Sequence, residues 1–106
     1  MSIIDRHSPR FAKIDTSASG ATELVAARTG KRILVLSYVV NASGAVGVKF
    51  QSASTDLTGT LTLAANQTQD AYYSEAGYFQ TVAGEALNIN LSGAVQVGGH
   101  LTWVEI

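Results

Sequence analysis

Residues 85–91 read Glu-Ala-Leu-Asn-Ile-Asn-Leu, and this stretch decides the fold class. Leu87, Ile89 and Leu91 occupy every second position, and asparagines stand between them. Strict alternation of apolar and polar residues is typical of a β-strand with one buried face. We therefore predict a strand here, with its leucine and isoleucine side chains turned toward a core.

The same period of two recurs along the chain, and glycine-containing pairs separate the runs. Val46, Val48 and Phe50, for example, alternate with a glycine and a lysine. Short links that contain glycine supply the positive φ angles of tight hairpin turns; here they are Thr29-Gly30, Ser43-Gly44, Ala83-Gly84 and Ser92-Gly93. We predict strands at about residues 11–16, 22–28, 31–41, 45–53, 57–64, 70–74, 77–82, 85–92 and 94–106.

These patterns predict an all-β protein: an antiparallel two-sheet sandwich, jelly-roll-like, with about eight strands once short runs merge. The motif Asn41-Ala-Ser-Gly-Ala-Val is echoed by Asn90-Leu-Ser-Gly-Ala-Val. We expect residues 22–53 and 77–106 each to form a three-stranded meander around it. The Gly98-Gly99 pair predicts a bulge or bend in the last strand.

We predict a single sandwich domain at residues 11–106, preceded by an N-terminal arm at residues 1–10. The arm contains the only proline and two arginines, Arg6 and Arg10. It is either a disordered tail or a segment that lies on a neighbouring subunit, with Ile3 and Ile4 as its apolar anchor.

Residues 33–40 differ from the other strands because both of their faces are apolar. Ile33, Val35 and Val39 would share one face, and Leu34, Leu36, Tyr38 and Val40 the other. In a sandwich only one face of a strand is normally inside. The second face therefore lies either under a loop or the N-terminal segment, or against another subunit. The second alternative predicts an oligomer, with Leu34, Leu36, Tyr38, Val40 and Trp103 as the candidate self-association residues.

Composition excludes several classes of function. Charged residues make up 14% of the chain, against about 25% in typical soluble domains. The formal net charge is −1 and there is no basic stripe, so we expect no binding to nucleic acid. The 106 residues include no cysteine, and no run approaches the roughly 20 apolar residues of a membrane span. The chain begins without the apolar run of a signal peptide, so we expect synthesis and folding in a cytoplasm.

No catalytic or metal site is apparent. The two histidines, His7 and His100, stand far apart in the chain, and no two carboxylates form a recognisable acid–base pair. The glycines lie at turns and not before a helix, which argues against a phosphate-binding loop. We predict that the chain is not an enzyme and needs no cofactor or metal.

Four aromatic residues gather within eight positions: Tyr72, Tyr73, Tyr78 and Phe79. They indicate either a strand–turn–strand whose rings cap the edge of the sandwich, or a contact surface. Tyrosine is well suited to contact sugars or proteins, because it combines apolar area with a polar hydroxyl at low entropic cost.

Several short segments resemble small tailed-phage virion proteins of the capsid decoration (cement) type. They are Gly30-Lys31-Arg32-Ile33-Leu34-Val35-Leu36-Ser37, Leu57-Thr58-Gly59, Leu63-Ala64-Ala65-Asn66, and the region from Gly84 through Leu91 to Gly99-His100-Leu101-Thr102. The resemblance extends over roughly residues 22–106, in short segments. The resemblance implies a homotrimeric jelly-roll protein that binds the major capsid protein and bridges capsid subunits in the virion. It carries over no catalytic residue.

The alternative function is a glycan- or protein-binding module of a phage fibre or tail. The candidate partner-contact residues are the arm residues Ile3, Ile4, Arg6 and Arg10, which would attach a decoration protein to its partner surface, and the aromatic residues Tyr72, Tyr73, Tyr78 and Phe79, which a binding module would use.

Overall fold

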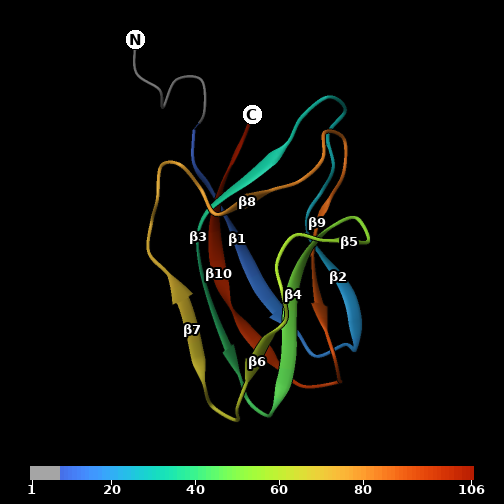
Figure 1. The fold of residues 1–106 in the computed structure, drawn as a ribbon, viewed down its shortest axis with the longest axis vertical. Helices are drawn as coiled ribbons and strands as arrows, with labels where there is room; N and C mark the ends of the chain where they lie inside the picture. Colours follow the sequence, from blue (N-terminus) through green and yellow to red (C-terminus); the bar gives the residue numbers. More distant parts are fainter. Residues whose placement is uncertain (1–7) are drawn as a thin grey trace.

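A computed structural model describes residues 8–106, which form two antiparallel β-sheets packed face to face (Figure 1). Sheet A contains β1 (Arg10–Thr16), β10 (Val97–Glu105), β3 (Ile33–Ala42), β7 (Thr68–Ala71) and β8 (Phe79–Gln80). Sheet B contains β2 (Gly20–Val25), β9 (Leu87–Leu91), β4 (Val46–Ser52), β5 (Thr55–Asp56) and β6 (Leu61–Leu63). The described region contains no helix, and therefore no helix that could cross a membrane. The all-β sandwich is thus confirmed.

The described region has ten strands, where about eight were predicted, because two strand positions are each divided. In sheet A the order is β1-β10-β3, and both β7 and β8 pair with the far side of β3. In sheet B the order is β2-β9-β4, and both β5 and β6 pair with the far side of β4. The divided strands are two to four residues long. Alternation over so few residues gives no usable signal.

The two predicted meanders were wrong. Consecutive strands β2, β3 and β4 lie in sheets B, A and B, and β8, β9 and β10 lie in sheets A, B and A. A turn residue shows where the chain reverses, but it does not show whether the next strand pairs with the previous one or crosses to the other sheet. In this fold most of the connections lead from one sheet to the other.

The two echoed motifs lie side by side as crossing corners between the sheets. The Ser43 N–H donates to the Gln96 carbonyl (2.9 Å), and the Ser92 N–H donates to the Gly47 carbonyl (2.9 Å). The β3–β4 turn and the β6–β7 turn lie at one end of the molecule, and the start of β1 and the C-terminus lie at the other (Figure 1).

The core fills the space between the sheets. Its fully buried side chains come from the inner faces of both sheets, including Ile14, Val35, Phe50, Ile89 and Leu101. Every second residue of β9 is buried, as the opening stretch of sequence predicts. No side-chain polar atom is left buried without a hydrogen bond among residues 8–106. The core between the two sheets is therefore built from side chains of one chain, and its buried polar side chains are all hydrogen-bonded.

The bulge predicted at Gly98-Gly99 in the last strand was wrong. The register of β10 against β3 is regular at these glycines, and where it shifts, at Thr102 and Trp103, the extra residue belongs to β3. Gly99 is needed for another reason: its φ is 150°, and a Cβ there would lie 1.8 Å from the Val39 carbonyl oxygen. Only glycine allows the two backbones to approach so closely.

Candidate binding surface

A β-bulge in β3 decides which side chains of this strand face outward. Along β10 the pairing moves from Thr102 opposite Ser37 to Trp103 opposite Val35, so Leu36 is an extra residue. A bulge inserts one residue into a strand and breaks the alternation of its side chains.

The predicted division of faces was therefore wrong at Tyr38 and Val40. Val40 is fully buried in the core, and Tyr38 packs against the same core. Val39, which was expected to share a face with Ile33 and Val35, is half-buried and lies outside the core cluster. Val40 is thus used inside the chain, and Tyr38 packs on the core with part of its side chain still exposed.

The segment 72–78, between β7 and β8, covers Leu34 and Leu36. The Ser74 N–H donates to the Leu36 carbonyl (2.9 Å), and Leu36 is only 2% exposed. Gly77 lies so close to Leu34 that an added Cβ would be 2.4 Å from Leu34 Cδ1. Of the two covers considered for this face, the loop is the one that the structure provides.

Phe79 and Tyr78 belong to an aromatic cluster that joins the two sheets. Ring centroids lie 5.1 Å apart for Phe50–Phe79, 5.3 Å for Tyr38–Phe50, and 6.3 Å for Tyr38–Tyr78, which meet edge to face. Such pairs stabilise by about 0.5–1.5 kcal/mol each beyond the area that they bury. Phe79 is thus a packing residue, as the edge-capping interpretation expected.

Tyr72, Tyr73 and Tyr78 form an exposed rim beside this cluster, which we call the tyrosine rim. Their exposed fractions are 85%, 58% and 48%. The Tyr78 hydroxyl donates to the Tyr72 carbonyl (2.6 Å), which ties the two ends of the segment together. The rim therefore presents apolar area on a backbone that is held in place.

Burial raises the pKa of the Tyr38 phenol above its usual value of 10.0, and the nearby Tyr78 and Asp70 act in the same direction. The Tyr38 hydroxyl therefore stays protonated and neutral at neutral pH. It contributes ring packing to the base of the rim and no charge.

Arg10 and Trp103 belong to the folded body. β1 begins at Arg10, which pairs with Trp103, so the predicted arm is too long by at least this residue. The Arg10 guanidinium lies 5.3 Å from the centre of the Trp103 ring, a cation–π contact. Trp103 is 9% exposed and packs in the core. The other candidate arm residues, Ile3, Ile4 and Arg6, lie outside the described residues.

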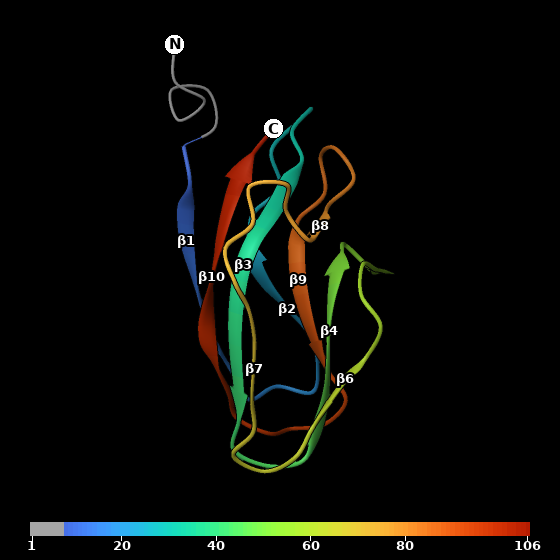
Figure 2. The same ribbon diagram turned by 60° about the vertical axis from the view of Figure 1, so that its left-hand side comes forward.

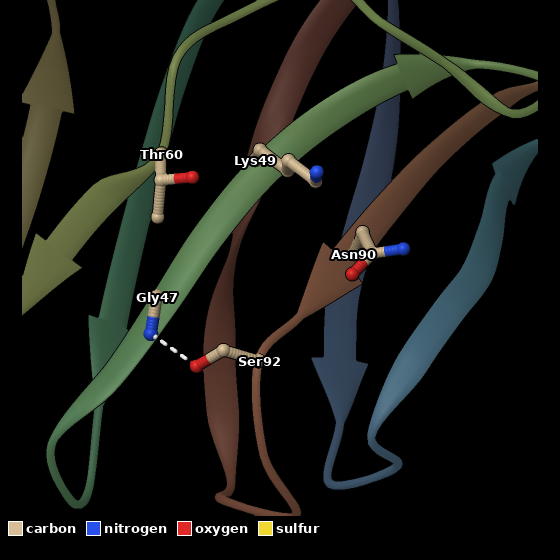
Figure 3. Close-up of a pocket in the computed structure, with 5 residues that line it drawn as sticks. All are labelled: Gly47, Lys49, Thr60, Asn90 and Ser92. Carbon is tan, nitrogen blue, oxygen red and sulfur yellow. Dashed lines mark hydrogen bonds between the residues drawn. The ribbon is translucent and has the colours of Figure 1, made fainter.

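A shallow polar pocket of about 190 Å³ lies on the outer face of sheet B (Figure 3). Its lining residues are Gly47, Lys49, Thr60, Asn90 and Ser92. The Gly47 N–H donates to Ser92 Oγ (2.8 Å), and a Cβ at Gly47 would lie 2.7 Å from the Thr60 methyl carbon. Hydroxyl, amide and ammonium groups here can hydrogen-bond a small polar group.

The cation of this pocket is already paired. Lys49 Nζ lies 3.1 Å from Asp56 Oδ2, and the Gln51 side-chain amide donates to Asp56 Oδ1 (2.8 Å). The hydrogen bonds from Gln51 and Lys49 lower the pKa of the Asp56 carboxyl below its usual value of 3.8. The group of residues fastens β5 to β4.

Sequence reasoning did not identify this pocket. The sequence signal for it was the set of polar positions between apolar ones, since Gly47 and Lys49 alternate with Val46, Val48 and Phe50, and Asn90 lies between Ile89 and Leu91. That β4 and β9 are neighbours, with Lys49 opposite Asn90, follows only from the sheet order.

His100 lies exposed on β10, in register with Lys13 of β1 and Val39 of β3. Among residues 8–106, no group of three histidine, cysteine or carboxylate side chains could hold a metal ion.

Comparison with known proteins adds no relative. No protein-family model matches the chain, and no curated protein matches it.

Proposed function

We propose that the chain is a phage virion structural protein, a capsid decoration (cement) protein that stabilises the head by bridging subunits of the major capsid protein. The observation that carries the proposal is the tyrosine rim on a body whose core is built from side chains of one chain. A solvent-exposed cluster of aromatic residues on a rigid scaffold is typical of a surface that binds a partner. The resemblance of residues 22–106 to capsid decoration proteins indicates the partner, which is the major capsid protein.

The strand order supports a jelly roll as the finer description of the sandwich. If β5 with β6, and β7 with β8, each count as one strand position, the sheets have four positions each. The order is then β1-β10-β3-β7/β8 in one sheet and β2-β9-β4-β5/β6 in the other. This is the interleaved order that two Greek keys produce, and jelly rolls are common in viral capsid proteins.

The homotrimer in this proposal rests on the resemblance. The apolar outer face of residues 33–40 no longer calls for a second subunit, because the segment 72–78 covers Leu34 and Leu36. A trimer that binds three equivalent lattice sites at once gains affinity through avidity, so modest contacts at each site are sufficient. Its destination would be the virion, after synthesis in the host cytoplasm.

The second candidate function is a glycan- or protein-binding module of a fibre or tail. The specific observation that favours it is the exposure of Tyr72 and Tyr73, since tyrosine rings also bind sugars.

One experiment separates the two candidates. Heads from a phage that lacks this gene are tested for rupture by heat or low ionic strength, before and after the purified protein is added back. The first function predicts fragile heads that the wild-type protein restores. The double variant Tyr72→Ser/Tyr73→Ser should bind at least about tenfold more weakly, as expected when aromatic anchors are removed. Thr62→Ala, on the outer face of sheet B, should bind as the wild type does.

The proposal fails if heads without the protein are as stable as wild-type heads and do not bind it. Binding to a glycan array that is lost in the double serine variant would then support the second candidate.

A further inference from the structure

β1 is an open edge of sheet A. Among the described residues its one hydrogen-bonded neighbour is β10, and Figure 2 shows it at the outer side of the sheet. An edge strand presents unpaired N–H and C=O groups, and these are a template for pairing with another strand. At seven residues, β1 is longer than the divided strands at the opposite edge of its sheet.

The outward side chains of β1 are Phe11, Lys13 and Asp15, all exposed, and they alternate with buried Ile14 and Thr16. Phe11 is 81% exposed. Natural edges are often protected by charges. Here the two charges have opposite sign and stand two residues apart, so the strand is complementary to itself when it runs antiparallel.

We infer that β1 pairs with β1 of a second copy of this chain, antiparallel about a two-fold axis at Ile14. Residues opposite each other on an antiparallel pair share one face of the sheet. With Ile14 opposite Ile14 of the second copy, Lys13 lies opposite Asp15 and Asp15 opposite Lys13. The pairing engages residues 12–16 of both copies and joins two sheets A into one continuous sheet.

Neighbouring registers lack this complementarity. A two-fold axis at Lys13 places two lysines opposite each other, and like charges in that position are destabilising. A two-fold axis at Ala12 leaves Lys13 opposite Phe11 and Asp15 without a partner. The open edge of sheet B is also less suitable, because β2 carries a single charged residue, Glu23.

The contact has two-fold symmetry, so it links copies in pairs and cannot close a trimer by itself. It is independent of the proposed function. On a capsid it would join copies that belong to neighbouring trimers.

Charge exchange tests the register. Sedimentation velocity over a wide range of protein concentration should show a species of twice the mass of one chain, or assemblies of two or more trimers if a separate interface forms a trimer. Lys13→Asp places two carboxylates opposite each other on both sides of the axis, and Asp15→Lys does the same with two lysines. Each should weaken the association at least about tenfold, and Lys13→Asp/Asp15→Lys should restore it.

Three controls keep the result interpretable. Asp15→Asn removes the charge but keeps the oxygen that accepts from Gln96 Nε2 (2.8 Å), so a weaker dimer in this variant reflects charge and not a local change in structure. Glu23→Lys makes the same charge change on β2 and should leave the association unchanged. Cooperative thermal unfolding confirms that each variant is folded.

Hydrogen exchange supplies a second readout, since amide protection in residues 12–16 should increase with protein concentration in the wild type. The inference is overturned if the mass stays at that of the unpaired unit at every concentration, or if the double exchange fails to restore association. It is also overturned if Glu23→Lys, and not Asp15→Lys, rescues Lys13→Asp, because that result would place β1 against β2 of the next copy.

Discussion

Gly77 decides, at the scale of a single residue, whether the segment 72–78 can fold over β3. Its φ is 82°, a conformation that L-residues adopt at a cost, and it lies against the Leu34 side chain. The sequence shows a glycine between aromatic residues, which is a turn signal. It does not show that the absence of a side chain is also what lets the segment pack on Leu34.

Gly77→Ala should therefore destabilise the protein more than Gly84→Ala. Gly84 has the same φ of 82° but has nothing within 4 Å of an added Cβ, so it isolates the backbone cost of about 1–2 kcal/mol. Overpacking against Leu34 should add about 1–3 kcal/mol at Gly77. Urea denaturation of the two variants measures the difference in the free energy of unfolding. Equal losses would mean that the segment does not pack on Leu34 as described.

At the scale of an element, Leu36 decides which side chains of β3 face the core, because it is the extra residue of the strand. Alternation in residues 85–91 and 46–50 predicts strands β9 and β4 and their buried faces correctly, because those strands are regular. In β3 the same reasoning fails after Val35, since one bulged residue reverses the inward and outward sides. A run that is apolar on both sides hides such a shift.

Deletion of Leu36 should leave cooperative folding intact, because without the extra residue Ile33, Val35, Tyr38 and Val40 still face the core in regular alternation. Both the deletion and Leu36→Ala remove a buried leucine side chain, and each should lose about 2–5 kcal/mol of stability. Circular dichroism during thermal unfolding measures both variants. Loss of the cooperative transition in the deletion variant alone would show that β3 has no bulge at this position, because a deletion in a regular strand exchanges its inner and outer faces.

At the scale of the whole molecule, the sequence predicts the class of the fold but not the arrangement of its strands. Period-two runs, glycine turns and the lack of a helical pattern are local signals, and they are sufficient for an all-β sandwich. The order of strands in each sheet depends on contacts between residues far apart in the chain. The polar pocket and the partners of β1 follow from that order, so neither could be derived beforehand.

The positions of the candidate contact residues depend on the same contacts. The sequence predicts a strand to residue 74, whereas β7 ends at Ala71 and leaves Tyr72 and Tyr73 exposed in the segment that follows. The inward positions of Tyr38, Phe79 and Trp103 depend on packing between the sheets, which the sequence does not show. The tyrosine rim is what remains of the predicted partner surface within residues 8–106.

Cryo-electron microscopy of virions with and without this gene product tests the central claim most directly. The account predicts additional density on the outer surface of the head, repeated at equivalent lattice positions, lost in the deletion virion, and fitted by a sandwich of 45 × 25 × 20 Å with its tyrosine rim against the capsid. Identical heads in the two virions, with the missing density on the tail or on a fibre, would contradict it.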